Sequence, residues 1–159
     1  MKMSGGVEWA LHCCVVLTGM AAPVPAARLA EFHDVSPTYL AKQLQALSRA
    51  GLVRSVQGQA GGYVLTRAAE EISVLDVVEA VDGSEPAFIC TEIRQRGPFA
   101  ATPDACRTPC GITRVMIDAD RAWRESLRAT SIADLAGTVA RDVGAETLPR
   151  AQAWIAQRT

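Results

Sequence analysis

The sequence lacks a strong excess of charge of either sign, and its apolar residues do not form a membrane-spanning run. Its 16 Lys and Arg residues against 17 Asp and Glu give a formal net charge of −1, so only the positions of the charges can indicate a charged partner. The apolar stretch from Val7 to Ala22 is interrupted by Glu8 and His12 and is shorter than a bilayer span. We therefore expect a core helix there, no signal peptide, no membrane contact, and a cytoplasmic protein.

The cysteines do not suggest a disulfide framework, because there are five of them, an odd number. In a reducing compartment the expected uses of cysteine are free thiols and metal ligands. Cys13 and Cys14 lie in the apolar stretch and are predicted to be buried as small hydrophobic residues. Cys90, Cys106 and Cys110 lie together in a segment rich in Gly, Pro and Arg. This second set is the candidate for metal or redox chemistry.

Apolar residues at helical spacing predict most of the secondary structure. A length of 159 residues, with 49% hydrophobic and 21% charged residues, is that of a globular chain able to bury a core. The predicted helices cover residues 7–20, 25–33, 38–50, 73–81, 111–129, 132–143 and 148–157. Alternating residues predict strands over 52–56 and 63–66, joined by a glycine-rich turn. The expected fold is mainly α with a small β-hairpin.

The helices over 25–33 and 38–50, joined by three residues and followed by the hairpin, have the arrangement of a winged helix-turn-helix. Ser36 is a good N-cap for the second helix and Pro37 a good first residue. From Pro25 to Arg67 the chain carries five basic residues against two acidic ones. The local positive charge therefore coincides with the predicted DNA reader.

The expected partner is a double-stranded DNA operator, with the second helix in the major groove and the hairpin as the wing. Lys42 and Arg54 are expected mainly at phosphates, whereas Thr38, Tyr39 and Gln43 are candidates for base edges. The full set of predicted DNA-contacting residues is Ser36, Thr38, Tyr39, Lys42, Gln43, Arg54, Gln57, Gln59, Gly61, Gly62 and Tyr63.

A long segment without periodicity separates this reader from the later helices. It runs from Pro86 to Pro109, and loops of this length in compact domains are usually functional or disordered. The helix over 111–129 that follows carries an apolar stripe along about 27 Å at ~1.5 Å per residue. Because an exposed apolar stripe usually packs against a partner, we expect this helix to mediate homodimerisation.

The motifs from Leu47 to Val53 (LSRAGLV) and from Gly58 to Leu65 (GQAGGYVL) resemble the Rrf2 superfamily of bacterial winged-helix regulators, the group of IscR, NsrR and RsrR. The opening Ser4 to His12 (SGGVEWALH) and the segment Cys90 to Ile93 are most similar to RsrR-like members. The resemblance extends to about Ala129. It implies a DNA-binding homodimer with a long dimerisation helix and a loop that carries an iron-sulfur cluster.

The cysteine spacing differs from that of most cluster-binding members, which have three closely and evenly spaced cysteines. Here fifteen residues separate Cys90 from Cys106, and three separate Cys106 from Cys110. In RsrR-like proteins the matching positions imply a [2Fe-2S] cluster held by two cysteines of one subunit and by a Glu and a His of the partner's first helix. Carried over, the ligands are Cys90, Cys110, Glu8 and His12, with Cys106 as an alternative to Cys110.

The residue types are consistent with that assignment. Glu8 and His12 are four residues apart, so on a helix their Cβ atoms lie about 5–6 Å apart and both side chains can reach one metal atom. Two thiolates suit one iron, and a mixed oxygen and nitrogen pair suits the other. The implied domains are a winged helix-turn-helix over 1–83, a cluster-binding loop over 84–110, and the dimerisation and C-terminal helices over 111–159.

These features leave three candidate functions. The first is a redox-sensing regulator, expected to be a repressor, in which the cluster changes the spacing of the two recognition helices over half-sites about 34 Å apart. The second is a cluster-free regulator that senses through Cys106 and Cys110 as thiols, or through a partner protein. The third, a small metal hydrolase using Glu8 and His12, lacks a second nearby histidine and a nucleophile, so we expect no enzyme and no small-molecule substrate.

Overall fold

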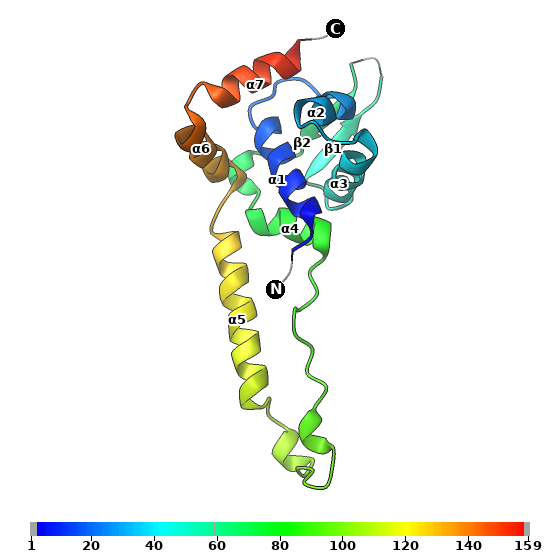
Figure 1. Cartoon of the computed structure of the whole chain (residues 1–159), viewed down its shortest axis with the longest axis vertical. Helices are drawn as coiled ribbons and strands as arrows, with labels where there is room; N and C mark the ends of the chain where they lie inside the picture. The colour runs from blue at the N-terminus through cyan, green and yellow to red at the C-terminus, as the bar shows by residue number, and fades with distance from the viewer. Residues whose placement is uncertain (1–2, 59, 158–159) are drawn as a thin grey trace. The chain divides into compact units, whose positions relative to one another are not determined.

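The structure is a computed structural model that describes residues 3–58 and 60–157 (Figure 1). Gln59, one of the predicted DNA-contacting residues, lies outside the described residues. The chain divides into two compact units, one formed by residues 85–126 and the other by the residues before and after that segment. No helix among the described residues is long and apolar enough to cross a membrane.

The larger unit begins with a winged helix-turn-helix. Its elements are α1 (Gly5–Leu17), α2 (Ala26–Phe32), α3 (Pro37–Arg49), β1 (Val53–Val56), β2 (Gly62–Leu65) and α4 (Val74–Asp82), with a 3-10 turn at Ala69–Glu71. Helix α1 packs against both α3 and α4, and α2 packs against α3. The predicted mainly helical fold with one antiparallel hairpin is confirmed, and the observed bounds lie within a few residues of the predicted ones.

The C-terminal helices α6 (Ile132–Val143) and α7 (Thr147–Ala156) belong to the same unit as the winged helix-turn-helix. Helix α6 packs on α1 and α7, and α7 also packs on α2. In the first turn of α2, Arg28 stacks on the ring of Trp154 of α7, with the guanidinium carbon 3.5 Å from the ring centroid. The structure thus places α6 and α7 with the DNA reader, whereas the sequence analysis grouped them with the dimerisation helix.

The core of this unit is formed by leucines of α2 and α3 and by the inner face of α1. Its fully buried side chains include Leu29, Leu40, Leu44, Leu47, Ile72, Ile132, Cys13 and Cys14. The predicted burial of Cys13 and Cys14 is confirmed. Burial raises the pKa of the Cys13 thiol to about 12 and raises that of Cys14 as well. Both cysteines therefore remain neutral thiols, unsuited to bind metal.

Two capping boxes define where α4 and α6 begin. The backbone N–H of Asp76 donates to Ser73 Oγ at 3.1 Å, and the N–H of Ser73 donates to the Asp76 carboxylate at 2.8 Å. Ser131 and Asp134 repeat this arrangement at α6. Ser36 stands at the N-cap of α3 as predicted, but its hydroxyl makes no capping hydrogen bond.

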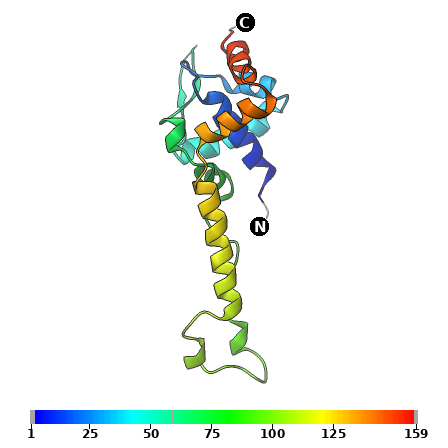
Figure 2. The same cartoon turned by 90° about the vertical axis from the view of Figure 1, so that its left-hand side faces the viewer.

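The smaller unit consists of the cysteine-containing loop and most of α5 (Gly111–Arg128). The loop has two short 3-10 turns, at Ile93–Gln95 and Asp104–Cys106. Figure 2 shows α5 as one continuous helix with this loop at its N-terminal end. Along α5, Ile112, Val115 and Met116 are 71%, 66% and 39% exposed, so the predicted apolar stripe is uncovered in the single chain.

A backbone bridge between Val24 and Tyr63 joins the wing to the linker between α1 and α2. The N–H of Val24 donates to the carbonyl of Tyr63 at 3.0 Å, and the N–H of Tyr63 donates back at 2.8 Å. Gly62, next to this bridge, has φ +154, and a Cβ there would collide with the backbone of Val24 and Pro25. Only glycine therefore lets the hairpin approach the α1–α2 linker this closely.

We expect Gly62→Ala to destabilise the protein by about 1–3 kcal/mol, because it combines backbone strain with a backbone collision. Gly58→Ala is the matched control, since Gly58 has φ +105 but open space around the position of its missing Cβ. Urea denaturation of both variants measures the difference. An equal loss of stability in the two variants would contradict the importance of the Val24 contact.

Candidate redox site and DNA-binding surface

Glu8 and His12 lie one turn apart on the solvent-exposed face of α1, as predicted. The opposite face of α1 is buried in the core, so the helix cannot turn these side chains inward. The start of α1 is anchored by Ser4, whose N–H and hydroxyl donate to the Asp82 carboxylate at 2.8 and 2.5 Å. This pair therefore has a fixed backbone and side chains that are exposed to solvent.

A cavity of about 430 Å³ lies beside this pair, lined by Trp9, Phe32 and residues of α6 and α7. His33, the residue after α2, lies within it. Its ring centroid is 5.7 Å from that of His12 and 5.9 Å from that of Trp9. Burial lowers the pKa of His33, and the neighbouring His12 lowers it further. Its Nε2 atom is buried and has no hydrogen-bond partner among the described residues.

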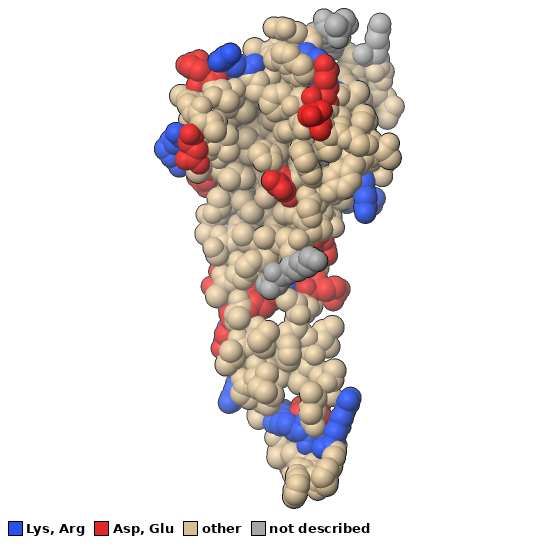
Figure 3. Space-filling view, viewed as in Figure 1, with Lys and Arg blue, Asp and Glu red and all other residues tan. Residues whose placement is uncertain are grey.

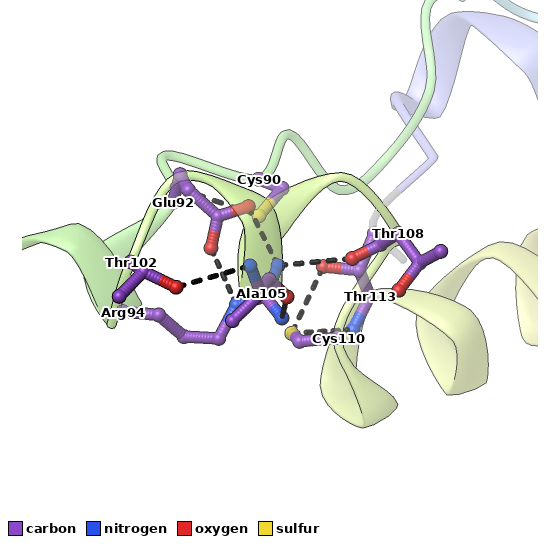
Figure 4. A network of polar contacts seen from close by, with 8 residues as sticks. All are labelled: Cys90, Glu92, Arg94, Thr102, Ala105, Thr108, Cys110 and Thr113. Atoms are coloured by element: carbon purple, nitrogen blue, oxygen red, sulfur yellow. Dashed lines mark hydrogen bonds and ion pairs between the residues drawn. The ribbon is translucent and has the colours of Figure 1, made fainter.

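The cysteine loop is organised by Arg94 (Figure 4). The Arg94 guanidinium forms a bidentate pair with the Glu92 carboxylate, at 2.6 and 2.9 Å. The same guanidinium donates to the carbonyls of Ala105 at 3.3 Å and Thr108 at 3.0 Å. Arg94 thereby joins the segment just after Cys90 to the segment that contains Cys106 and precedes Cys110.

The sulfur atoms of Cys90 and Cys110 accept hydrogen bonds from this loop and from α5. The N–H of Glu92 donates to Cys90 Sγ at 3.4 Å. Cys110 Sγ lies 3.3 Å from the Thr113 hydroxyl and accepts the Thr113 N–H at 3.4 Å. The two hydrogen bonds from Thr113, and to a lesser degree the charge of Arg94, lower the pKa of the Cys110 thiol. A lower pKa increases the fraction of the thiolate, which is the form that binds metals.

Basic side chains gather on this loop and the first turn of α5, as Figure 3 shows. Residues 86–114 contain four arginines against two acidic residues. A positive environment stabilises thiolate sulfur and an anionic cofactor.

The four predicted ligands thus form two pairs in different units. Glu8 and His12 belong to the larger unit, whereas Cys90 and Cys110 belong to the smaller one. Across the described part of the chain, no three His, Cys, Asp or Glu residues come together to hold a metal ion. Each pair offers donors that suit iron, but neither pair is a complete site. The donor types therefore fit a group shared between two pairs.

The predicted DNA-binding surface is largely exposed. Ser36, Thr38, Tyr39 and Lys42 of α3 and its N-cap are exposed, and so are Arg54 and Gln57 of the wing. Gly61, Gly62 and Tyr63 are only partly exposed, and the last two hold the wing to Val24.

The expected exposure of Gln43 is wrong. Its side chain is only 4% exposed and lies over Gly6 of α1, where a Cβ on Gly6 would be 2.5 Å from Gln43 Oε1. The missing side chain of Gly6 creates the space that the glutamine fills. Gln43 therefore joins α3 to α1 and is not available to a base edge.

Sequence reasoning also missed three polar residues around the candidate ligands. It placed His33 in the reader helices without connecting it to His12, and it assigned no role to Arg94 or Thr113. The spacing of Thr113, three residues after Cys110, was a usable signal for a capping contact at the start of α5.

A winged helix-turn-helix of this kind is the fold of a DNA-binding transcription regulator, and here it is accompanied by a separate loop of cysteines. The family model described as "Iron-dependent Transcriptional regulator" matches residues 3–138, and the chain belongs to this Rrf2 family. The prediction of an Rrf2-type regulator that is not an enzyme is confirmed.

The relatives include regulators of different names. The putative HTH-type transcriptional regulator YwgB of Bacillus subtilis is 29% identical over 83% of this chain and 82% of its own length. The HTH-type transcriptional regulator IscR of Escherichia coli is 42% identical over 76 residues, about half of either chain (48% and 47%).

Solved structures show the same fold. The global cysteine regulator CymR of B. subtilis has a TM-score of 0.66 at 24% identity, covering 87% of this chain and 98% of that one. The IscR structure from T. potens has a TM-score of 0.63 at 23% identity, covering 92% and 91%.

We expect Arg94→Ala to loosen the cysteine loop, because it removes every hydrogen bond that joins the two arms through this side chain. Hydrogen exchange of the amides from residues 101 to 110 should become several-fold faster. Arg107→Ala is the control, because Arg107 pairs only locally with the exposed Asp104 at 2.9 Å. Unchanged exchange in Arg94→Ala would show that another interaction holds the loop.

Proposed function

We propose that this chain is a redox-sensing transcription regulator whose operator binding is controlled by a [2Fe-2S] cluster shared between two subunits. Cys90 and Cys110 of one protomer and Glu8 and His12 of its partner would hold the cluster. The observation that carries this proposal is the separation of two ordered ligand pairs, each with suitable donors and each incomplete, into different units of one chain.

The cluster supplies reversible one-electron chemistry, and the protein residues determine how that chemistry is read. Two thiolate ligands suit one iron, while a carboxylate and an imidazole suit the other. The hydrogen bonds from Glu92 and Thr113 orient the two sulfur atoms. His33 lies against His12 and fixes the position of its ring.

Helix α1 provides a physical link between the ligands and the DNA reader. Glu8 and His12 lie on α1, and Gly6, two residues before Glu8, contacts Gln43 of the recognition helix α3. A change in the position of α1 would therefore move α3. In a dimer, such a shift alters the spacing of two recognition helices that read half-sites about 34 Å apart.

The dimer is proposed to form through the exposed stripe of α5. An uncovered stripe of this length requires an apolar partner, and the α5 of a second protomer is a partner whose chain also brings the other ligand pair, on its α1. On DNA, Lys42 and Arg54 would bind phosphates, and Thr38 and Tyr39 would reach base edges. Ser36 and Gln57 are further proposed contacts at the edges of this surface. The cellular location is proposed to be the cytoplasm, where operator DNA lies.

Anaerobically purified protein is expected to be coloured and to contain two irons and two sulfides per site. Glu8→Ala, His12→Ala, Cys90→Ala and Cys110→Ala should each bleach the visible spectrum, because each removes one of the four ligands. Cys106→Ala is the matched control and should keep the colour. Iron and sulfide analysis together with the visible spectrum measures the result.

Colourless wild-type protein after anaerobic reconstitution would overturn the cluster proposal. It would favour the second candidate function, sensing through thiols, for which the observation is the lowered pKa of Cys110 in a loop that also contains Cys106. Bleaching by Cys106→Ala but not by Cys110→Ala would instead assign the ligand role to Cys106.

Val115→Glu is expected to convert the dimer to a monomer, because it places a charge in the apolar stripe of α5. Ile117→Glu is the matched control. Ile117 is also exposed, at 44%, but it lies on a different side of the helix from Ile112, Val115 and Met116. Light scattering after size-exclusion chromatography gives the mass of each variant. A dimeric Val115→Glu protein would rule out this stripe as the interface.

A further inference from the structure

Thr113 is the buried residue of α5. It is 8% exposed, whereas the other described side chains of this helix are half-buried or exposed. A buried hydroxyl needs a hydrogen-bond partner. The partner of the Thr113 hydroxyl is the sulfur of Cys110, at 3.3 Å. This contact therefore accounts for a polar side chain in a buried position.

Cys110 occupies the N-cap position of α5. Its carbonyl accepts the N–H of Arg114 at 3.0 Å, which is the first hydrogen bond of the helix. Its Sγ accepts the N–H of Thr113, three residues later, at 3.4 Å. The sulfur thus takes the place of the oxygen of a serine or aspartate cap. The partial positive charge at the start of the helix adds to the stabilisation of a thiolate there.

A sulfur bound to iron carries no proton, so in the proposed site the Thr113 hydroxyl must be the donor. Cys110 Sγ would then accept two hydrogen bonds from Thr113, one from the hydroxyl and one from the backbone. Cys90 Sγ accepts the backbone N–H of Glu92. The two thiolates of the site are therefore electronically unequal.

We propose that Thr113 is a positioning residue that raises the reduction potential of the shared cluster by donating its hydroxyl hydrogen bond to the Cys110 sulfur. This inference rests on the proposed function. Hydrogen bonds to ligand sulfur withdraw electron density and stabilise the extra electron of the reduced form. One electron enters from an external reductant, and Thr113 keeps its proton in both states.

The test is a potentiometric titration with dithionite, under anaerobic conditions, of the intact cluster-loaded protein. Thr113→Val keeps the size of the side chain and the backbone N–H but removes the hydroxyl. We expect its reduction to be about tenfold less favourable, a decrease of ~59 mV for a one-electron couple. Thr113→Ser, which keeps the hydroxyl, should restore most of the wild-type potential.

Thr108→Val is the matched control. It removes a hydroxyl from the same loop, where Thr108 contacts Arg94 through its backbone carbonyl, and its potential should equal that of the wild type. Equal potentials for Thr113→Val and wild type, at equal cluster content, would overturn the inference. So would a Thr113→Ser protein that behaves like Thr113→Val.

Iron and sulfide content is measured before each titration, so the two proposals fail in different ways. Wild-type protein without a cluster overturns the proposed function and this inference with it. If Thr113→Val alone loses the cluster, Thr113→Ala is titrated in its place, because it removes the same donor with less bulk. Loss of the cluster in both variants would overturn a tuning role and assign Thr113 to assembly.

Discussion

The close approach of α1 and α3 at Gly6 is the constraint on which this account of the protein depends. Gly6 has no side chain, and the Gln43 side chain fills the space above it, nearly excluded from solvent. Because the inner face of α1 is buried, Glu8 and His12 are held outward on a helix that is in contact with the recognition helix. The proposed ligand pair and the DNA reader thus share one helix–helix contact. In the proposed mechanism this single contact would carry the coupling, so no long pathway is needed.

The cysteine pair depends on a second polar interaction, the clasp formed by Arg94. It joins Glu92 to the carbonyls of Ala105 and Thr108, which lie eleven and fourteen residues after Arg94. A loop with no periodicity and several prolines would otherwise have many conformations, at a large cost in entropy on binding a cofactor. The clasp reduces this cost by ordering the loop in advance. In the proposed site, the basic residues of the loop would also offset the negative charge of the thiolates.

Most of the fold could be predicted from the sequence, because local signals specify it. Apolar spacing located α1 to α7. Gln43 could not be placed correctly, because a polar residue on an amphipathic helix is normally exposed and its burial depends on a glycine in another helix. The clasp of Arg94 and the contact between His33 and His12 likewise join residues distant in sequence, which no periodicity reveals. The four candidate ligands came from a family resemblance, and the structure shows how their backbones are held.

Mixing two inactive variants tests the central claim of a site shared between subunits. One variant carries Glu8→Ala and His12→Ala, and the other carries Cys90→Ala and Cys110→Ala, so neither homodimer has a complete ligand set. After subunit exchange and anaerobic reconstitution, the mixed dimer has one intact site, formed by the cysteines of one protomer and the Glu and His of the other. If the site is shared between subunits, the visible absorption of the cluster appears in the mixture and in neither variant alone. A mixture that exchanges subunits but stays colourless, beside a coloured wild type, would contradict it.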